Sequence, residues 1–427
     1  MVAFLLVLVV VLAVLGGVHW YVWRRLVRDV TVAGGLPRRL GTVAVVALPL
    51  FSLAALTSSR AGAPFWFQQV VAWPGFLWLA LLLYVTLALV VGEAVRPVLR
   101  ARLERRAKAA APGEAAPVPV PEPVSVPDSV PDAVTAAPPA EAAPPAAETP
   151  VDVSRRLFVS RVVGGSAAAV ALGTVGYGAY GVLRGPRVKR VTVPLAKLSR
   201  AAHGYRIAVV SDIHLGPILG RAHSRRIVDA INSTQPDLIA IVGDLVDGTV
   251  ENLGPAAEPL ARLRARHGSF FVTGNHEYFS GADAWVDHVR ELGLRPLRNE
   301  RVEIAAGFDL AGVDDVAGES EGQGPDFGRA LGDRDRARAA VLLAHQPIVI
   351  HDAVRNGVDL QLSGHTHGGQ LWPGNYLAEL ANPTVAGLER YGDTQLYVSR
   401  GAGAWGPPVR VGAPSDITIV ELASKQA

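Results

Sequence analysis

The sequence predicts an α/β domain of layered sheets and helices in its C-terminal part, preceded by helices that cross a membrane. Two observations support this prediction. After residue 190, short apolar runs rich in β-branched residues alternate with helical patterns, as in sheets that are buried on both faces. Before residue 110 the apolar stretches are much longer, and half of all 427 residues are hydrophobic, more than a soluble enzyme of this size usually carries.

Three apolar stretches near the N-terminus are long enough, or nearly so, to cross a bilayer. They run from Val2 to Trp23, from Leu40 to Thr57 and from Trp73 to Val95. An aromatic cluster at residues 63–67 lies between the second and the third, and such side chains favour the membrane interface. Residues 1–108 are therefore predicted to form a membrane domain with three transmembrane helices.

The basic residues predict the orientation of this membrane domain. Arginines cluster after the first and the third stretch, whereas the loop after the second stretch holds only Arg60. The positive-inside rule places the two arginine-rich segments in the cytoplasm and the N-terminus outside.

Residues 109–153 are predicted to be a disordered linker. As far as residue 150 the segment consists mainly of Ala, Pro, Val and Glu and contains no basic residue. A segment of this composition cannot bury a hydrophobic core, so we expect a partly extended spacer.

Residues 154–185 are predicted to form a fourth transmembrane helix or a signal anchor. Ser154-Arg155-Arg156-Leu157-Phe158 precedes an apolar stretch from Val162 to Leu183. The motif resembles a twin-arginine signal, although it is internal, which would make the twin-arginine translocase a partner. Both readings predict a multi-pass protein of the plasma membrane with residues 186–427 on the extracytoplasmic side. Four basic residues between positions 184 and 190 oppose this orientation.

Charge and cysteine content exclude several kinds of site. The net charge of +3 is small for the length, so nucleic acid binding is not expected. The chain has no cysteine, which excludes disulfides and thiolate metal ligands.

Five strand-like runs in the C-terminal part each end in Asp, Asn or His, mostly beside glycine. The runs cover residues 206–210, 237–242, 269–273, 340–344 and 358–362. The polar residues that follow them are Asp212 and His214, Asp244, Asn275 with His276 and Glu277, His345, and His365 with His367. Open α/β sheets bind ligands at the carboxyl ends of their strands. We therefore expect these side chains to meet at one edge.

The ligand types in these motifs predict a metal site. We expect the first run to continue as extended chain, so that Asp212 and His214 point the same way and one ion can contact both. Imidazole nitrogens, carboxylates and an amide oxygen, without sulfur, suit Mn²⁺, Fe or Zn²⁺. Helical patterns at 221–233 and 282–292, strand pairing within 303–313, and closing strands at 396–400 and 417–422 complete the predicted domain.

In this order, the motifs resemble the calcineurin-like metallophosphoesterase superfamily over residues 191–422. The form Gly-His-Thr-His-Gly-Gly-Gln at 364–370 resembles its membrane-associated bacterial branch, which includes enzymes acting on UDP-2,3-diacylglucosamine. The resemblance implies an αββα sandwich for residues 186–427, with two packed mixed sheets flanked by helices.

The resemblance also implies two divalent metal ions and a role for each motif residue. One ion would be held by Asp212, His214 and His367, and the other by Asn275, His345 and His365. Asp244 would bridge the two ions, because a carboxylate offers two charged oxygens. His276 would contact the substrate and stabilise the phosphoryl group or protonate the leaving oxygen. Asp247 and Glu277 could orient neighbours or simply cap loops.

The expected reaction is hydrolysis of a phosphodiester or pyrophosphate in a lipid-linked or cell-envelope substrate. A phosphomonoesterase, including a phosphoprotein phosphatase, and an inactive membrane-tethered sensor are the alternatives. The loop at residues 371–394 carries Trp372, Tyr376, Leu377 and Leu380, which either contact an acyl chain or pack against the domain.

Overall fold

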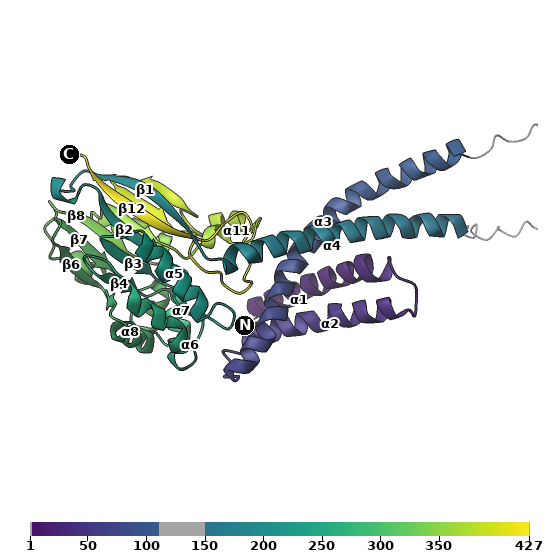
Figure 1. The fold of residues 1–427 in the computed structure, drawn as a ribbon, viewed down its shortest axis with the longest axis horizontal. Helices are drawn as coiled ribbons and strands as arrows, with labels where there is room; N and C mark the ends of the chain where they lie inside the picture. Colours follow the sequence, from purple (N-terminus) through teal and green to yellow (C-terminus); the bar gives the residue numbers. More distant parts are fainter. Residues whose placement is uncertain (1, 111–149, 427) are drawn as a thin grey trace, which may run out of the picture. The chain divides into compact units, whose positions relative to one another are not determined.

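The computed structural model describes residues 2–110 and 150–426 of the chain (Figure 1). Most of the predicted linker at residues 109–153 lies outside these described residues. By its internal contacts the chain divides into two compact units. One combines residues 1–42 with 85–169, and the other combines residues 43–84 with 170–427. The boundaries expected at residues 108, 153 and 185 stay a prediction.

Four of the described helices are long and apolar enough to cross a membrane. They are α1 (Val2–Trp23), α2 (Leu36–Thr57), α3 (Phe65–Ala110) and α4 (Pro150–Leu183). A π-helical turn, η1 (Arg24–Arg28), extends α1. Helix α3 is much longer than its apolar stretch predicted. It begins at Phe65, so most of the aromatic cluster forms its first turn.

In the first unit, one ion pair and one hydrogen bond join the α1–η1 segment to the middle of α3. Arg25 Nη2 lies 2.8 Å from Glu93 Oε2, and the Tyr21 hydroxyl donates a hydrogen bond of 3.0 Å to the same carboxylate. Arg161 of α4 donates to the carbonyl of Val30, at 3.1 Å. The arginine-rich segment after α1 therefore contacts both α3 and α4 within this unit.

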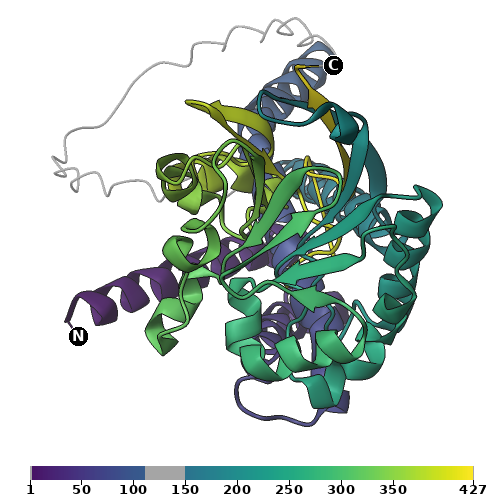
Figure 2. The same ribbon diagram turned by 90° about the vertical axis from the view of Figure 1, so that its left-hand side faces the viewer.

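The second unit contains two six-stranded mixed sheets (Figures 1 and 2). The first sheet has the order β1-β12-β2-β3-β4-β5, with β1 (Arg187–Leu195), β12 (Asp416–Ser424), β2 (Tyr205–Val210), β3 (Leu238–Val242), β4 (Ser269–Val272) and β5 (Arg295–Pro296). The second has the order β10-β11-β9-β8-β7-β6, with β10 (Gly387–Tyr391), β11 (Thr394–Val398), β9 (Leu360–Ser363), β8 (Ala339–Leu343), β7 (Phe308–Gly312) and β6 (Glu300–Ile304). Strands β2, β3 and β4 are parallel neighbours, and so are β7, β8 and β9.

Helices and short turns connect these strands. The helices are α5 (Arg221–Ser233), α6 (Val250–Ala257), α7 (Asn275–Ser280), α8 (Ala282–Glu291), α9 (Phe327–Leu331), α10 (Ile350–Arg355) and α11 (Gly374–Ala381). The 3₁₀ turns are η2 (Arg200–Ala202), η3 (Glu258–Arg262), η4 (Val316–Glu321), η5 (Pro347–Val349) and η6 (His367–Gly369).

Three hydrophobic cores hold the layers together. Alternate residues of β2 show the division, because Ile207 and Val209 face the core between the sheets whereas Ala208 and Val210 face the core beneath α5, α6 and α8. Helices α9 and α10 cover the outer face of the second sheet in the same way. In Figure 1, α5, α6 and α8 lie on one side of the sheet that contains β2, β3 and β4. The predicted αββα sandwich is confirmed.

Three of the four basic residues at 184–190, namely Arg187, Lys189 and Arg190, belong to a strand of the first sheet. Strand β1 begins at Arg187 and pairs in parallel with β12 along nine residues. Lys189 forms an ion pair with the buried Asp416 of that neighbour. The sequence pattern did not reveal this strand, because three of its first four residues are basic and it lies at the edge of the sheet.

Candidate metal centre

The structure brings the predicted ligands together beyond the carboxyl ends of five strands. Asp212 and His214 follow β2, Asp244 follows β3, and Asn275 opens α7 after β4, while His345 follows β8 and His365 and His367 follow β9. Ligand atoms of Asp212, His214 and His367 lie within 4.8 Å of one another, and so do those of Asp244, His345 and His365. Asn275 joins the second group, because its Oδ1 lies 3.0 Å from Nδ1 of His365.

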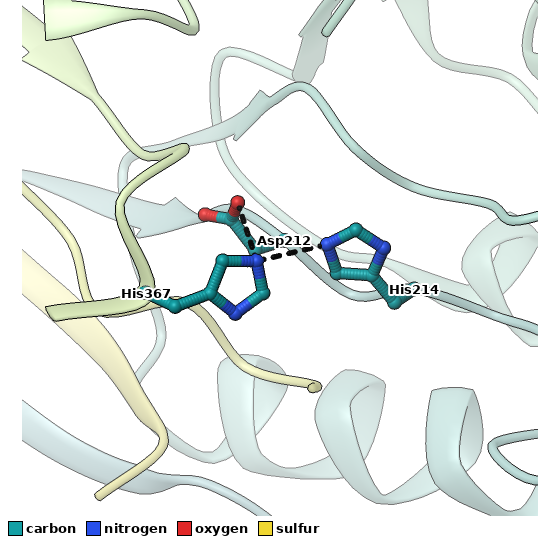
Figure 3. A group of neighbouring side chains, drawn as sticks. All are labelled: Asp212, His214 and His367. Carbon is teal, nitrogen blue, oxygen red and sulfur yellow. Dashed lines mark hydrogen bonds and ion pairs between the residues drawn. The ribbon is translucent and has the colours of Figure 1, made fainter. Parts of the chain in front are cut away.

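The side chains of the first group point toward one another (Figure 3). Nε2 of His367 lies 3.3 Å from Oδ1 of Asp212 and 3.0 Å from Nε2 of His214. Two imidazole nitrogens at this distance cannot both carry a proton that points at the other. The Asp212 oxygen and the two imidazole nitrogens thus lie close enough together to be ligands of one shared cation.

The second group contains an orphaned buried nitrogen. Nδ1 of His345 donates to the carbonyl of Val242 at 2.9 Å, which leaves Nε2 without its proton when the ring is neutral. This Nε2 is buried, has no hydrogen-bond partner and lies 3.2 Å from Oδ2 of Asp244. A second interaction that fixes the ring in this way is characteristic of a metal-ligating histidine.

Asp244 lies between the two groups. Its Oδ2 is 3.2 Å from Nε2 of His345 and 3.7 Å from Nε2 of His214. The carboxylate is buried, and its other oxygen accepts a hydrogen bond of 2.9 Å from the backbone N–H of His276. This position fits the bridging ligand that the resemblance implies.

The electrostatics of the site favour a bound cation. Burial opposes charge on His345, but the carboxylates of Asp244 and Asp212 outweigh it and raise the pKa of His345 well above its ordinary value. Burial lowers the pKa of His365 to about 4, so that this ring is a neutral ligand at pH 7. The residues thus favour positive charge beside Asp244, which a divalent cation would supply in place of a proton. The donor set fits the implied metals.

The backbone at the ligands is strained. Asp212, His214, Asp244, His365 and His367 all have φ between 49° and 73°, the left-handed region that residues other than glycine rarely adopt. Each such residue costs about 1–3 kcal/mol. The expectation that Asp212 and His214 continue an extended strand is therefore wrong, because β2 ends at Val210. The two side chains meet through tight loop conformations instead.

Asp247 connects a predicted ligand with the predicted substrate-binding histidine. Its Oδ1 lies 2.8 Å from Nδ1 of His214 and 2.8 Å from Nδ1 of His276. Burial alone would raise the pKa of Asp247, but the two histidines outweigh it and lower that pKa to about 2. Nothing in the sequence favoured this role for Asp247 over that of a loop cap.

His276 stands beside the ligands at the edge of a cavity. Its Nε2 is 4.0 Å from Oδ2 of Asp244, and its ring packs edge-on against Phe279 and Trp405 at centroid distances of 5.5 and 5.7 Å. Burial opposes its charged form, but Asp247 and Asp244 outweigh burial and raise the pKa of His276 to about 9. With Nδ1 held by Asp247, its Nε2 is the atom that can donate to a bound anion.

Glu277 is buried and supports the loop that carries Asp244. Its carboxylate accepts hydrogen bonds from the backbone N–H groups of Gly274, Asp244 and Leu245, at 2.6, 3.0 and 2.8 Å. Burial and the nearby charge of Asp244 raise the pKa of Glu277 to about 7. Glu277 therefore positions Asp244 and does not reach either ligand group.

Two supporting residues lie outside every motif of the sequence. The buried Arg410 donates to the carbonyls of His367 and Gly403, at 3.0 and 2.7 Å. Gly403 N–H donates to the carbonyl of Asp212 at 2.8 Å. Both residues are in an irregular segment before β12 with no strand or helix pattern around them. No signal in the sequence identified them.

Comparisons with known proteins agree with this geometry. The family model described as calcineurin-like phosphoesterase matches residues 205–369. The chain is 39% identical over 264 residues to a "transmembrane protein with metallophosphoesterase domain" of Danio rerio, an alignment that covers 59% of this chain and 60% of that protein. It is 38% identical over 260 residues to an uncharacterized metallophosphoesterase of Helicobacter pylori, covering 60% and 69%.

A third relative is covered almost completely. An uncharacterized metallophosphoesterase of Aquifex aeolicus is 36% identical over 243 residues, which cover 56% of this chain and 92% of that protein. The chain spans about three fifths of the length of the Danio rerio protein. The residues matched by the family model include every predicted ligand from Asp212 to His367, and the chain belongs to the calcineurin-like metallophosphoesterase family.

Proposed function

We propose that this chain is a membrane-anchored phosphodiesterase or pyrophosphatase that uses two divalent metal ions. The observation that carries the proposal is the position of Asp244 between two convergent ligand groups. Asp212, His214 and His367 would hold one ion, Asn275, His345 and His365 the other, and Asp244 both. Manganese, iron or zinc suits these ligands. When bound, such ions supply Lewis acidity toward the phosphoryl oxygens and activate water.

His276 would act on the substrate. Its Nδ1 is held by Asp247 at 2.8 Å, so that its Nε2 can donate a proton to the leaving oxygen. Hydrolysis then breaks the bond between phosphorus and the leaving oxygen, and water provides the new oxygen on phosphorus. Asp247 is a positioning residue, because it fixes His276 and His214 through one oxygen.

The substrate class can be tested with purified full-length protein in detergent, loaded in turn with Mn²⁺, Fe²⁺ or Zn²⁺. We expect turnover of a diester, bis-p-nitrophenyl phosphate, or of a lipid pyrophosphate to exceed that of p-nitrophenyl phosphate at least about tenfold. The physical reason is that a membrane tether raises the local concentration of lipid-linked substrates. Faster turnover of the monoester would contradict the proposal and favour a phosphomonoesterase. No turnover with any metal would favour a sensor.

We further propose that the catalytic domain lies on the extracytoplasmic side of the plasma membrane. Two observations, one in each unit, support this topology. In the first unit, Arg161 near the start of α4 bonds to Val30 in the arginine-rich loop after α1. In the second unit, Phe65 at the turn between α2 and α3 packs against the core beneath α5, α6 and α8. The positive-inside rule places the α2–α3 turn outside the cytoplasm, and a catalytic domain that packs against this turn would lie on the same side.

The role of Arg155 and Arg156 can be tested by replacing both with lysine. A twin-arginine signal requires the arginines themselves, whereas the positive-inside rule needs only the charge. If the pair is a signal, export is expected to fail in the double-lysine variant, and the domain becomes protected from protease in intact spheroplasts. The control is the wild-type protein, whose domain is expected to be digested. A protected wild-type domain would contradict the topology, and equal digestion of both would contradict only the signal.

A further inference from the structure

The end of the α2–α3 hairpin forms one wall of the cavity beside His276. This cavity has a volume of about 520 Å³, in the range of ligand pockets. His214, Asp247 and His276 line its inner end, and Leu53, Leu56 and Phe76 of the hairpin line the other side. All of these residues belong to the second compact unit. The wall comes from helices that the sequence assigns to the membrane, more than 130 residues before the first metal-ligand motif.

Several contacts attach this hairpin to the catalytic domain. The hydroxyl of Tyr84 on α3 donates to the carbonyl of Trp372 at 2.9 Å. Phe65 packs against the hydrophobic core beneath α5, α6 and α8. The ring of Phe76 lies next to Gly406, where a Cβ would be 3.7 Å from the ring. These contacts hold the hairpin against the loop that carries Trp405.

The wall combines apolar side chains with one cation. Leu53 and Leu56 are 59% and 48% exposed, so that the cavity side of α2 offers uncovered apolar surface. Arg60, in the turn between the helices, has no carboxylate partner among the residues that the structure describes. Its guanidinium lies 5.8 Å from the ring centroid of Phe279, and Phe279 packs against His276 at 5.5 Å.

We infer that the α2–α3 hairpin is part of the substrate site and that it selects a phosphoester with a long apolar chain. The phosphoryl group lies at the metal ligands, and the apolar chain lies along Leu53, Leu56 and Phe76. Arg60 attracts the negative charge of the substrate at the mouth of the cavity. Because α2 and α3 are membrane spans, the chain of a lipid reaches this wall from the bilayer without crossing water. The inference rests on the proposed phosphoesterase reaction.

The surface that the sequence suggested for an acyl chain is a different one. Leu377 and Leu380 on α11 are 71% and 85% exposed, and neither lines the cavity beside His276. An apolar chain bound there would be separate from the hairpin wall. Variants of α11 therefore serve as controls for variants of the hairpin.

The experiment compares two diesters with the same leaving group, methyl p-nitrophenyl phosphate and hexadecyl p-nitrophenyl phosphate. Full-length protein is assayed in one fixed detergent, and the ratio of the two kcat/KM values is the readout. We expect the ratio to be at least about 10 in the wild type. In Leu56→Ala and Phe76→Ala it should fall below about 3, because kcat/KM falls much more for the hexadecyl diester than for the methyl diester. Leu380→Ala should keep the wild-type ratio.

Replacing Arg60 is expected to have a different kinetic effect from replacing the apolar residues of the wall. Arg60→Ala should raise KM about tenfold for both diesters while kcat stays within about threefold, because the guanidinium acts on charge and not on the chain. Arg60→Lys should recover most of the loss, and the matched surface variant Arg390→Ala should behave as wild type. A purely structural effect of Arg60 would lower kcat and would not be rescued by lysine, which would overturn its assignment.

The outcomes separate this inference from the proposed function. Hydrolysis of both diesters with equal efficiency by the wild type would overturn the hairpin site and leave the phosphodiesterase standing. If Leu380→Ala lowered the ratio of the kcat/KM values and Leu56→Ala did not, the apolar chain of the substrate would bind at α11. This result would also overturn the hairpin site. If the wild type hydrolyses neither diester but cleaves a monoester, the proposed function and the inference both fail.

Discussion

Asp244→Ala is expected to remove both bound metal and hydrolytic activity, whereas His276→Ala is expected to keep the metal and lose only the rate. Asp244 lies within 3.7 Å of ligand nitrogens from both groups, so that its loss removes a ligand from each site. His276 contributes general acid catalysis, which is worth about 10²–10⁴-fold in rate. Metal content by elemental analysis, measured beside the turnover of bis-p-nitrophenyl phosphate, distinguishes the two variants.

The control for these variants removes a carboxylate elsewhere in the same domain. The Asp393 side chain is fully exposed in the turn between β10 and β11, and Asp393→Ala should keep both metal and turnover. Thermal unfolding of all variants in the presence of metal separates loss of fold from loss of ligand. The role assignment would be wrong if His276→Ala lost its metal, or if its turnover stayed within about threefold of wild type.

The strands that lead into the predicted metal ligands could be predicted from the sequence. Strands β2, β3 and β8 are buried on both faces, so that their sequences are continuous apolar runs that end where the polar ligands begin. The helix predicted at residues 221–233 has the same bounds in the structure, as α5. Because parallel strands end at one edge of a sheet, the meeting of Asp212 and Asp244 followed from the pattern alone. His345 follows β8 of the second sheet, so its approach to them depends on how the two sheets pack.

The unpredictable part depends on contacts between distant segments. Asp247 is recognisable as a partner of His214 and His276 only after β3 and β4 are neighbours in the sheet. The left-handed conformations of the ligands leave no mark in the sequence, because they are imposed by surrounding loops rather than by residue preference. The hairpin wall was even less predictable from the sequence, because its residues were recognisable only as parts of membrane spans.

Gly403 shows how tightly one such distant contact constrains the site. A Cβ at Gly403 would lie 2.0 Å from the carbonyl oxygen of Ile213 and 3.0 Å from that of Asp212. Both atoms belong to the backbone between the ligands Asp212 and His214, so that no side-chain rotation can relieve the overlap. The backbone of that loop would have to move, and it already holds two residues with positive φ.

Gly403→Ala is therefore expected to lower turnover by about 100-fold or more and to weaken metal binding, although Gly403 is not itself a ligand. Displacement of catalytic groups by about 1 Å costs rate on this scale, and overpacking also lowers the free energy of unfolding by about 1–3 kcal/mol. Gly220→Ala is the matched control, because a Cβ there meets nothing within 4 Å and the backbone is extended. Metal content, turnover and thermal unfolding are measured for both variants. Normal metal binding and turnover in Gly403→Ala would mean that the loop between Asp212 and His214 can shift without consequence, and that the close approach does not hold the ligands in place.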